Sequence, residues 1–310
     1  MHPNKMSSKT LKIKPIPVPL GNKHPSAPNM VLPSHEFTMG LIAPKGSGKT
    51  TLMCNILQFY KHYFHTIIIF SPTINNDDKW DYMKEQDLLV ENVGLKRWAK
   101  DLLDAKENKN QVVAPRPVDV ALGGLIDLQS IAGNGAKKRD DKFDGKIPAS
   151  CFYMEYNEAD LVKIFDQQQA MIDLLKAHKQ PKHLANRIMI LFDDMVGSSL
   201  FSGSRANFFK KLNSNHRHWS TSIMMVSQGY KEIPKTPRCN WTCIILFEIW
   251  NDAELECIYE ENPMGLKKEQ WMEAYKHATS DDYSFMFYNI QRPRALRLMK
   301  NFDQVMYFKE

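Results

Sequence analysis

The chain has 310 residues, and 43% of them are hydrophobic, which is enough to bury the core of one large α/β domain or two small ones. Its formal net charge of +6 is compatible with an anionic partner such as nucleic acid and also with an ordinary solvated surface. Five cysteines without a framework spacing argue against a disulfide-stapled secreted protein, and no apolar run approaches the roughly 20 residues of a membrane span, so we expect a soluble intracellular protein.

The first 33 residues are rich in proline and lysine, and the first thirty contain no acidic residue. This composition predicts an extended basic arm over residues 1–33. The arm could contact DNA or a neighbouring subunit, or it could be a flexible tail without a specific partner.

A phosphate-binding loop is predicted after the first apolar strand, Phe37–Ile42. The loop reads A-P-K-G-S-G-K-T and leads directly into an amphipathic helix, which is the context that a P-loop requires. Its glycines allow successive N–H groups to point at phosphate oxygens, Lys49 reaches the β and γ phosphates, and the Thr50 hydroxyl is a ligand for Mg²⁺. Ala43 stands where the first glycine of the motif is usual. The predicted nucleotide-binding residues are Ala43, Pro44, Lys45, Gly46, Ser47, Gly48, Lys49, Thr50 and Thr51.

The next part of the chain predicts a second buried strand, an insertion and a long helix. The β-branched run Thr66–Ser71 is typical of a parallel strand. Residues 106–148 are polar and rich in Gly and Pro, so we expect a mobile insertion there, and its basic run Lys137–Arg139 is a candidate DNA contact. Asn157 is a predicted N-cap, and apolar residues at helical spacing predict a helix from there to about His178.

The apolar run 187–192 ends in two carboxylates, Asp193 and Asp194. A central parallel strand that delivers a carboxylate to its C-terminal edge is the Walker B element of a P-loop protein. We expect Asp193 to hold Mg²⁺ through water, and Asp194 to orient or deprotonate the attacking water.

A helix over about Ser204–Asn213 and a strand over Ile223–Val226 follow, and the strand ends at Ser227 and Gln228. Gln228 carries a neutral donor and acceptor that could contact the γ phosphate and the lytic water. Arg217 lies before the strand, on the side that faces away from its own nucleotide, which makes it a candidate arginine finger for an adjacent subunit. The alternative is a surface arginine paired with a local carboxylate. We assign no catalytic role to the flanking His216 and His218.

The C-terminal part predicts a fifth core strand, two helices, a β-hairpin and an edge strand. Alternating aromatic residues in the hairpin favour packing on a sheet over stacking on bases, and Cys239 and Cys243 are interpreted as small hydrophobic residues beside a strand rather than half a metal site. The predicted ranges are Thr242–Trp250, Asn251–Glu261, Lys267–His277, Asp282–Ile290 with Ala295–Met299, and Val305–Phe308, and the aromatic residues are Tyr283, Phe285, Phe287 and Tyr288.

Taken together, the motifs A-P-K-G-S-G-K-T, I-L-F-D-D and R-H-W-S-T-S-I-M-M-V-S-Q resemble those of the FtsK/HerA superfamily. Within it, the chain is most similar to the genome-packaging ATPases of poxvirus-like large DNA viruses and virophages. The resemblance implies a RecA-like α/β P-loop fold of the additional-strand class, with a core over residues 34–250 and C-terminal helices and a small β-hairpin over residues 251–310. Ala43, and Asp194 where many cellular relatives carry Glu, depart from the usual pattern.

The resemblance further implies a Mg²⁺-dependent ATPase that packages double-stranded DNA into a viral capsid. Lys49, Asp194, Gln228 and Arg217 are the expected catalytic residues, Thr50 and Asp193 the metal ligands, and ATP and Mg²⁺ the cofactors. The expected partners are double-stranded DNA bound without regard to sequence, further copies in a ring of five or six, and capsid or vertex proteins. Such a protein is expected in the cytoplasmic viral factory or the virion.

The sequence argues against some other functions and leaves two of them open. A GTPase would carry an N-K-x-D motif, which this sequence lacks, and a small-molecule kinase would usually show an Arg-rich lid. A helicase shares the same core and stays an alternative. A DNA-binding or capsid-associated protein that binds nucleotide for structure alone is the non-enzymatic alternative, although Asp193, Asp194 and Gln228 argue for hydrolysis.

Overall fold

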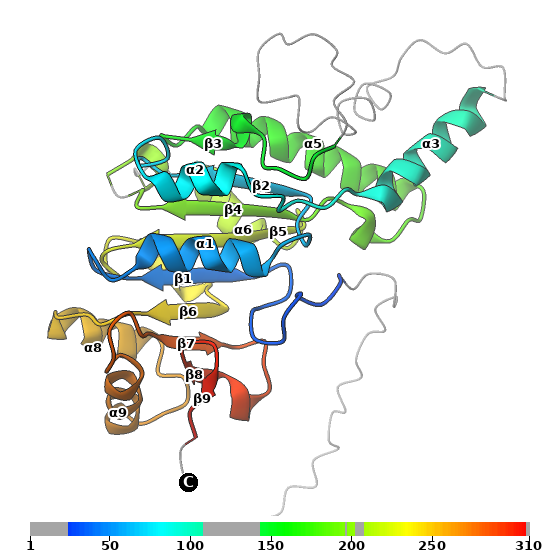
Figure 1. Ribbon diagram of the computed structural model, residues 1–310. Coiled ribbons are helices and arrows are strands. Elements are labelled where there is room, and N and C mark those ends of the chain that lie inside the picture. The colour runs from blue at the N-terminus through cyan, green and yellow to red at the C-terminus, as the bar shows by residue number, and fades with distance from the viewer. Residues whose placement is uncertain (1–23, 108–142, 196, 202–207, 308–310) are drawn as a thin grey trace, which may run out of the picture.

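A computed structural model describes residues 24–107, 143–195, 197–201 and 208–307. These residues form one nine-stranded sheet with the order β3-β2-β4-β5-β1-β6-β7-β8-β9 (Figure 1). The strands from β3 to β6 are parallel, and β7, β8 and β9 are antiparallel to their neighbours. The bounds are β1 Thr38–Ile42, β2 Thr66–Phe70, β3 Phe152–Tyr153, β4 Ile188–Asp193, β5 Thr221–Ser227, β6 Cys243–Leu246, β7 Met286–Asn289, β8 Leu298–Lys300 and β9 Gln304–Val305.

The position of β5 confirms the predicted fold class. β5 pairs with β1, which leads into the P-loop, on one side and with β4, which ends in Asp193, on the other. This additional strand between the two motif-bearing strands is the arrangement expected of a RecA-like P-loop protein. Parallel strands end at the same edge of a sheet, so the order brings the P-loop and the Walker B carboxylates to one edge.

Helices cover the two faces of the sheet in separate groups. One face buries side chains of α1 and α2, and the other buries side chains of α5, α6, α8 and α9. The α-helices are α1 Lys49–Phe59, α2 Asp78–Lys84, α3 Val93–Glu107, α5 Glu158–Ala177, α6 Phe208–Asn215, α7 Lys235–Cys239, α8 Asp252–Glu261 and α9 Lys268–Ala278. Short 3₁₀ helices cover Ala149–Cys151, Lys182–Leu184, Ser199–Phe201 and Arg294–Leu296.

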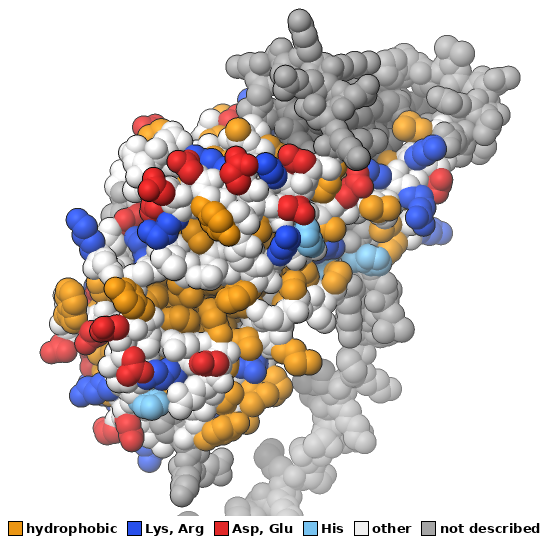
Figure 2. Space-filling view, viewed as in Figure 1, with side chains coloured by type: hydrophobic (Ala, Val, Ile, Leu, Met, Phe, Trp, Pro, Cys, Tyr) orange, Lys and Arg blue, Asp and Glu red, His pale blue; other side chains and the backbone are white. Residues whose placement is uncertain are grey.

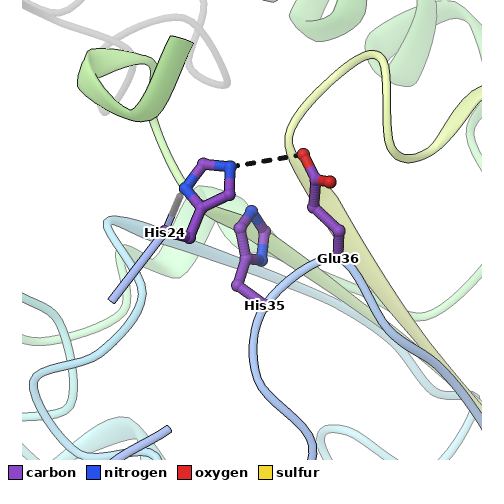
Figure 3. Close-up of side chains that lie close together, drawn as sticks. All are labelled: His24, His35 and Glu36. Carbon is purple, nitrogen blue, oxygen red and sulfur yellow. Dashed lines mark hydrogen bonds and ion pairs between the residues drawn. The ribbon is translucent and has the colours of Figure 1, made fainter. Parts of the chain in front are cut away.

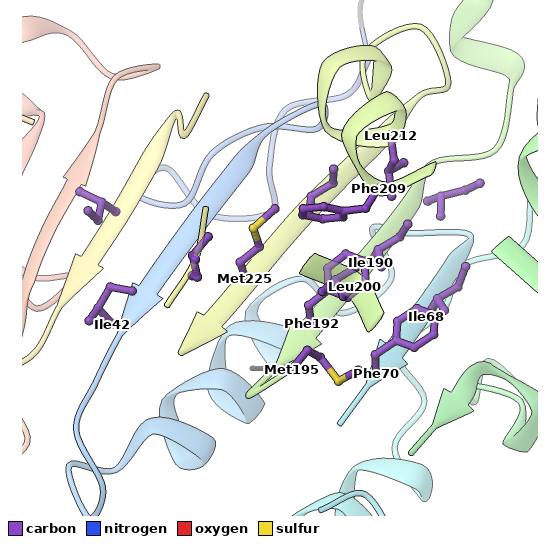
Figure 4. Close-up of a cluster of buried hydrophobic side chains, with 14 of the residues drawn as sticks. Ile42, Ile68, Phe70, Ile190, Phe192, Met195, Leu200, Phe209, Leu212 and Met225 are labelled. Carbon is purple, nitrogen blue, oxygen red and sulfur yellow. The ribbon is translucent and has the colours of Figure 1, made fainter. Parts of the chain in front are cut away.

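The central strands are apolar on both sides because both faces of the sheet are covered. Along β4, Ile188, Ile190 and Phe192 belong to the cluster under α5 and α6, whereas Met189 and Leu191 belong to the cluster under α1. Figure 4 shows the first cluster between β4 and its neighbours and α6. This two-sided burial explains the unbroken apolar run that the sequence presents before Asp193.

The predicted start of the helix after Asn157 agrees closely with the structure. The Asn157 side chain accepts a hydrogen bond from the Asp160 backbone N–H at 3.1 Å, so Asn157 caps α5 as predicted. The polar residue therefore fixes where the helix begins, because it satisfies an N–H group that has no partner within the helix.

The C-terminal region differs in detail from the prediction. β6 has four residues rather than nine, and β7 pairs with it, so the predicted hairpin extends the main sheet. Phe285 and Phe287 are buried as expected, but Tyr283 lies before β7 and is 70% exposed. The predicted alternation fails at Tyr283 because this residue belongs to a turn. Cys239 is exposed, which is also contrary to the expectation.

Residues 24–36 pack against the end of the sheet opposite the P-loop, where the central parallel strands begin. Tyr63 Oη donates to the Pro25 carbonyl and Tyr60 Oη to the Pro33 carbonyl, each at 2.7 Å. The rest of the predicted arm, the run Lys137–Arg139, most of 106–148 and the predicted helix start at 204–207 lie outside the described residues. No helix in the described part of the chain is long and apolar enough to cross a membrane.

On the face that carries α1, hydrophobic side chains gather on the surface below this helix, over the strands on the β6 side (Figure 2). Phe59 of α1 is 44% exposed and contacts the partly buried Phe302, with ring centroids 6.1 Å apart. Among the described residues, α1 and α2 are the α-helices that contribute buried side chains to this face, so the strands beyond β6 are less covered here than on the other face.

Candidate nucleotide-binding site

The loop between β1 and α1 has the backbone conformation of a phosphate cradle. Gly46 and Gly48 have φ values of 84° and 88°, in the left-handed region that favours glycine. Ser47 N and Oγ both contact the Pro44 carbonyl, at 3.3 and 2.7 Å, which closes the turn. Ala43 is buried at the end of β1 and has a negative φ, so the departure from glycine at this position costs no backbone strain.

Asp193 is the most buried acidic group at this edge. Its side chain is 4% exposed, and the Ser71 hydroxyl donates to Oδ2 at 2.8 Å. Oδ1 is buried without a hydrogen-bond partner among the described residues and lies 4.0 Å from Lys49 Nζ. Burial raises the pKa of the Asp193 carboxyl, although Lys49 and Ser71 act in the opposite direction. The geometry leaves this carboxylate oxygen without a hydrogen bond, and its ionic neighbour is Lys49.

Asp194 lies between Lys49 and Gln228. Its Oδ2 is 3.2 Å from Lys49 Nζ and accepts a hydrogen bond from Gln228 Nε2 at 2.5 Å. The Asp194 backbone N–H donates to the Val226 carbonyl at 2.9 Å, and its φ of 51° turns the chain away from β4 at this point. Four of the predicted residues, Lys49, Asp193, Asp194 and Gln228, therefore meet at one edge of the sheet.

The remaining predicted P-loop residues lie between β1 and the first turn of α1. Thr50 is half-buried in the first turn of α1, whereas Lys45 and Thr51 are exposed. Of these three residues, Thr50 is the least exposed.

Two residues that the sequence did not single out support the site. Ser71 follows β2 and holds Asp193. Glu232 accepts hydrogen bonds from Ser227 Oγ at 2.6 Å and from the Gly229 N–H at 3.0 Å, which fixes the turn that carries Gln228. The sequence could have indicated Ser71, because it is the polar residue that directly follows the apolar strand β2. Glu232 gave no signal, because its role depends on a turn that only the structure reveals.

Arg217 lies at the end of the sheet opposite the P-loop, before the first residue of the central strand β5. It is exposed and belongs to the turn that precedes β5, so it cannot reach the P-loop of its own chain. Its carbonyl oxygen accepts a hydrogen bond from Lys182 Nζ. His216 beside it is buried and contacts the Asn213 carbonyl through Nδ1 at 3.0 Å, whereas His218 is exposed.

A second group of polar residues, His24, His35 and Glu36, could in principle hold a metal ion, because their ligand atoms lie within 4.8 Å of one another (Figure 3). Each already has other partners. The two ring nitrogens of His35 contact Ser222 and Ser220 at 2.8 and 3.1 Å, and Glu36 pairs with His24 at 3.3 Å and with Lys182. Because both His35 nitrogens and Glu36 Oε1 already have partners within the protein, we interpret the group as a polar network that fastens the segment before β1 to β5.

The model of one known protein family matches part of the chain. Residues 147–286 match the family model of the poxvirus A32 protein. Over these residues, which are less than half of the chain, the sequence is similar to that family. The matched range begins before β3 and includes Asp193, Asp194, Arg217 and Gln228, whereas the P-loop lies ahead of it. No curated protein is significantly similar to the chain.

Solved structures show more distant likenesses. The genome packaging NTPase B204 from Sulfolobus turreted icosahedral virus 2, in complex with ATP-gammaS, is 13% identical, with 86% of this chain and 98% of that chain covered and a TM-score of 0.44. Its complex with sulfate is 12% identical, with coverages of 82% and 92% and a TM-score of 0.46. The pCW3 conjugation coupling protein TcpA is 11% identical, with coverages of 82% and 58% and a TM-score of 0.36. At such distances the fold assignment rests on the strand order, and no activity follows from the likeness.

Proposed function

We propose that the chain is a viral genome-packaging NTPase that hydrolyses ATP with Mg²⁺ and moves double-stranded DNA. The observation that carries the proposal is the convergence of Lys49, Asp193, Asp194 and Gln228 at the P-loop edge. The match of residues 147–286 to a viral family supports the packaging role. A protein that only binds nucleotide needs neither a water-orienting carboxylate nor a sensor beside the phosphates.

The residues divide the chemistry of hydrolysis among them. The backbone N–H groups of the P-loop hold the phosphates, and Lys49, which lies beside Asp194, moves to the β and γ oxygens when nucleotide binds. Asp194 and Gln228 then share the attacking water: the carboxylate accepts its proton and the amide orients it. Because aspartate is one methylene shorter than glutamate, Gln228 has the larger part in positioning this water.

The donor atoms at the site fit Mg²⁺, which prefers oxygen ligands. The buried Asp193 Oδ1 without a hydrogen-bond partner and the Thr50 hydroxyl are the groups that would hold it, Asp193 through water. When bound, Mg²⁺ neutralises charge on the β and γ phosphates.

Arg217 supplies the proposed link between subunits. Its exposed position at the edge opposite the P-loop suits a finger that enters the site of a neighbouring copy, and a head-to-tail contact of this kind closes into a ring of five or six. Contacts with DNA would be mainly to phosphates, which makes binding insensitive to sequence and weaker at high salt. A capsid or vertex protein and a location in the viral factory or virion belong to the same proposal.

The experiment that tests the function measures steady-state ATPase activity with and without blunt duplex DNA, over a range of protein concentrations. The wild type, Lys49→Ala, Arg217→Ala and the matched control Arg97→Ala, an exposed arginine of α3, are compared. We expect activity that rises with duplex and with concentration, an inactive Lys49→Ala, and a control like the wild type.

Mixing two inactive variants distinguishes a finger in trans from a local role. A mixture of Lys49→Ala and Arg217→Ala should recover part of the activity, because intact P-loops then face intact arginines. Hydrolysis without such recovery would remove the ring from the proposal. Strand separation by the wild type would favour the helicase, and no hydrolysis under any condition would favour a nucleotide-binding structural protein.

A further inference from the structure

Tyr283 is an exposed aromatic residue that lies against the phosphate-binding loop. Its Cδ1 atom is 3.1 Å from the position that a Cβ atom on Gly48 would occupy, although the two residues are far apart in the sequence. The residue is 70% exposed and has a φ of 61°, a left-handed conformation that bulky residues rarely adopt. The turn therefore presents a large flat side chain to solvent directly beside the P-loop.

Hydrogen bonds on both sides of Tyr283 hold this turn in place. The Ser284 N–H and Oγ donate to the Asp281 carbonyl at 3.0 and 2.7 Å. Lys300 of β8, whose side chain is 9% exposed, pairs with the Asp281 carboxylate. Phe285 is buried with its ring centroid 5.0 Å from that of Phe302. The position of Tyr283 is thus set by the C-terminal strands.

The order of strands shows which end of a nucleotide would meet Tyr283. β4 and β5, which carry Asp193, Asp194 and Gln228, lie on one side of β1, and β6 and β7 lie on the other (Figure 1). Leu246 of β6 is opposite Met286 of β7, so Tyr283 lies beyond the same sheet edge as the P-loop. With the γ phosphate directed to the carboxylates, the nucleoside leaves the P-loop toward β6 and β7.

We propose that Tyr283 stacks on the base of the nucleotide held by the P-loop. The inference rests on the proposed function, since it takes the P-loop as the phosphate site. A tyrosine ring offers flat contact area with few rotatable bonds, and stacking tolerates different bases because every base has a π face. Tyr283 therefore contributes to affinity for a nucleotide but not to affinity for its phosphates alone.

Calorimetric titration with ADP and with pyrophosphate, each with Mg²⁺, tests this division. The proteins are the wild type, Tyr283→Ala, Tyr283→Phe and Tyr307→Ala, the last a comparably exposed tyrosine after β9. We expect Tyr283→Ala to bind ADP about tenfold more weakly, the order of magnitude of one lost stacking contact. It should bind pyrophosphate like the wild type, and Tyr283→Phe and Tyr307→Ala should keep wild-type affinity for both.

The outcomes separate this proposal from the function on which it rests. Equal ADP affinity of Tyr283→Ala and the wild type would overturn the stacking contact and leave the proposed function intact. An equal loss of ADP and pyrophosphate affinity would also overturn it, because the tyrosine would then act by supporting Gly48. If the wild type bound neither ligand, the proposed function would fall, and the stacking contact with it.

Discussion

Gln228 donates a hydrogen bond to Asp194 at 2.5 Å, and this contact joins the ends of two neighbouring parallel strands, β5 and β4. Both side chains also lie near Lys49, since Asp194 Oδ2 is 3.2 Å from its ammonium. Gln228, Asp194 and Lys49 thus form one hydrogen-bonded and ionic group, and a change at any of them alters the surroundings of the other two.

Gln228→Ala is expected to lower kcat by about 10²- to 10³-fold, since it removes a group that orients the attacking water in the transition state. Nucleotide affinity should change little because Gln228 is not part of the P-loop. Steady-state kinetics and a direct binding measurement check the two effects, with the exposed Gln304→Ala as the control. A loss of affinity with unchanged kcat would show that Gln228 contributes to binding instead.

Ser71→Ala is expected to weaken metal affinity by about 10- to 100-fold, because the Ser71 hydroxyl holds the carboxylate that would bind the metal. The substitution should also raise the pKa of Asp193 further, which moves the acid limb of the activity profile to higher pH. The Mg²⁺ dependence of hydrolysis at several pH values measures both effects. Ser214→Ala, at an exposed serine of α6, is the control, and an unchanged Mg²⁺ requirement in Ser71→Ala would contradict the assignment.

Two histidines, the buried His35 and the partly buried His65, predict loss of stability in acid. Burial, with the positive charge of Arg187, lowers the pKa of His65 to about 3, and burial lowers that of His35 well below its usual range. Below pH 6.5 the unfolded chain binds protons at these rings that the folded chain does not, so stability present at neutral pH is lost as the pH falls. Each ring should cost about 1.4 kcal/mol per pH unit in this range.

Denaturant unfolding between pH 7 and pH 4 measures this slope. His65→Asn should reduce the slope, because His65 Nδ1 accepts the Arg187 N–H at 2.8 Å only when that nitrogen is unprotonated, whereas the exposed His218→Asn should leave it unchanged. A stability that does not depend on pH in this range would contradict the prediction.

Gly40→Ala is expected to destabilise the fold by about 1 to 3 kcal/mol through overpacking. Gly40 is in the middle of β1, and a Cβ atom there would lie 2.4 Å from the Trp241 ring. Chemical denaturation of the variant measures the loss. Gly94→Ala in α3, where the nearest atom is the end of the Leu184 side chain at 3.1 Å, is the control and should cost less.

Much of the fold and of the candidate site could be predicted from the local pattern of residue types in the sequence. The β-branched and apolar runs specified the parallel strands because those strands are buried on both faces, and the P-loop and Asp193-Asp194 could be recognised because their chemistry requires adjacent residues. The contacts of Ser71, Glu232 and Tyr283 could not be predicted, since each depends on distant segments that meet only in the folded sheet. Tyr283 in particular was assigned to sheet packing, because a positive φ leaves no trace in the hydrophobic pattern.

The outermost strands of the sheet, β3 and β9, have two residues each. A long open edge would offer a row of unpaired N–H and C=O groups to a second copy, and pairing of that kind leads to open-ended aggregates. Edges this short present little backbone for such pairing. In the ring that we propose, copies of this chain would meet through side chains on loops and helices rather than by pairing these two strands, and charge and shape would make that contact both specific and reversible.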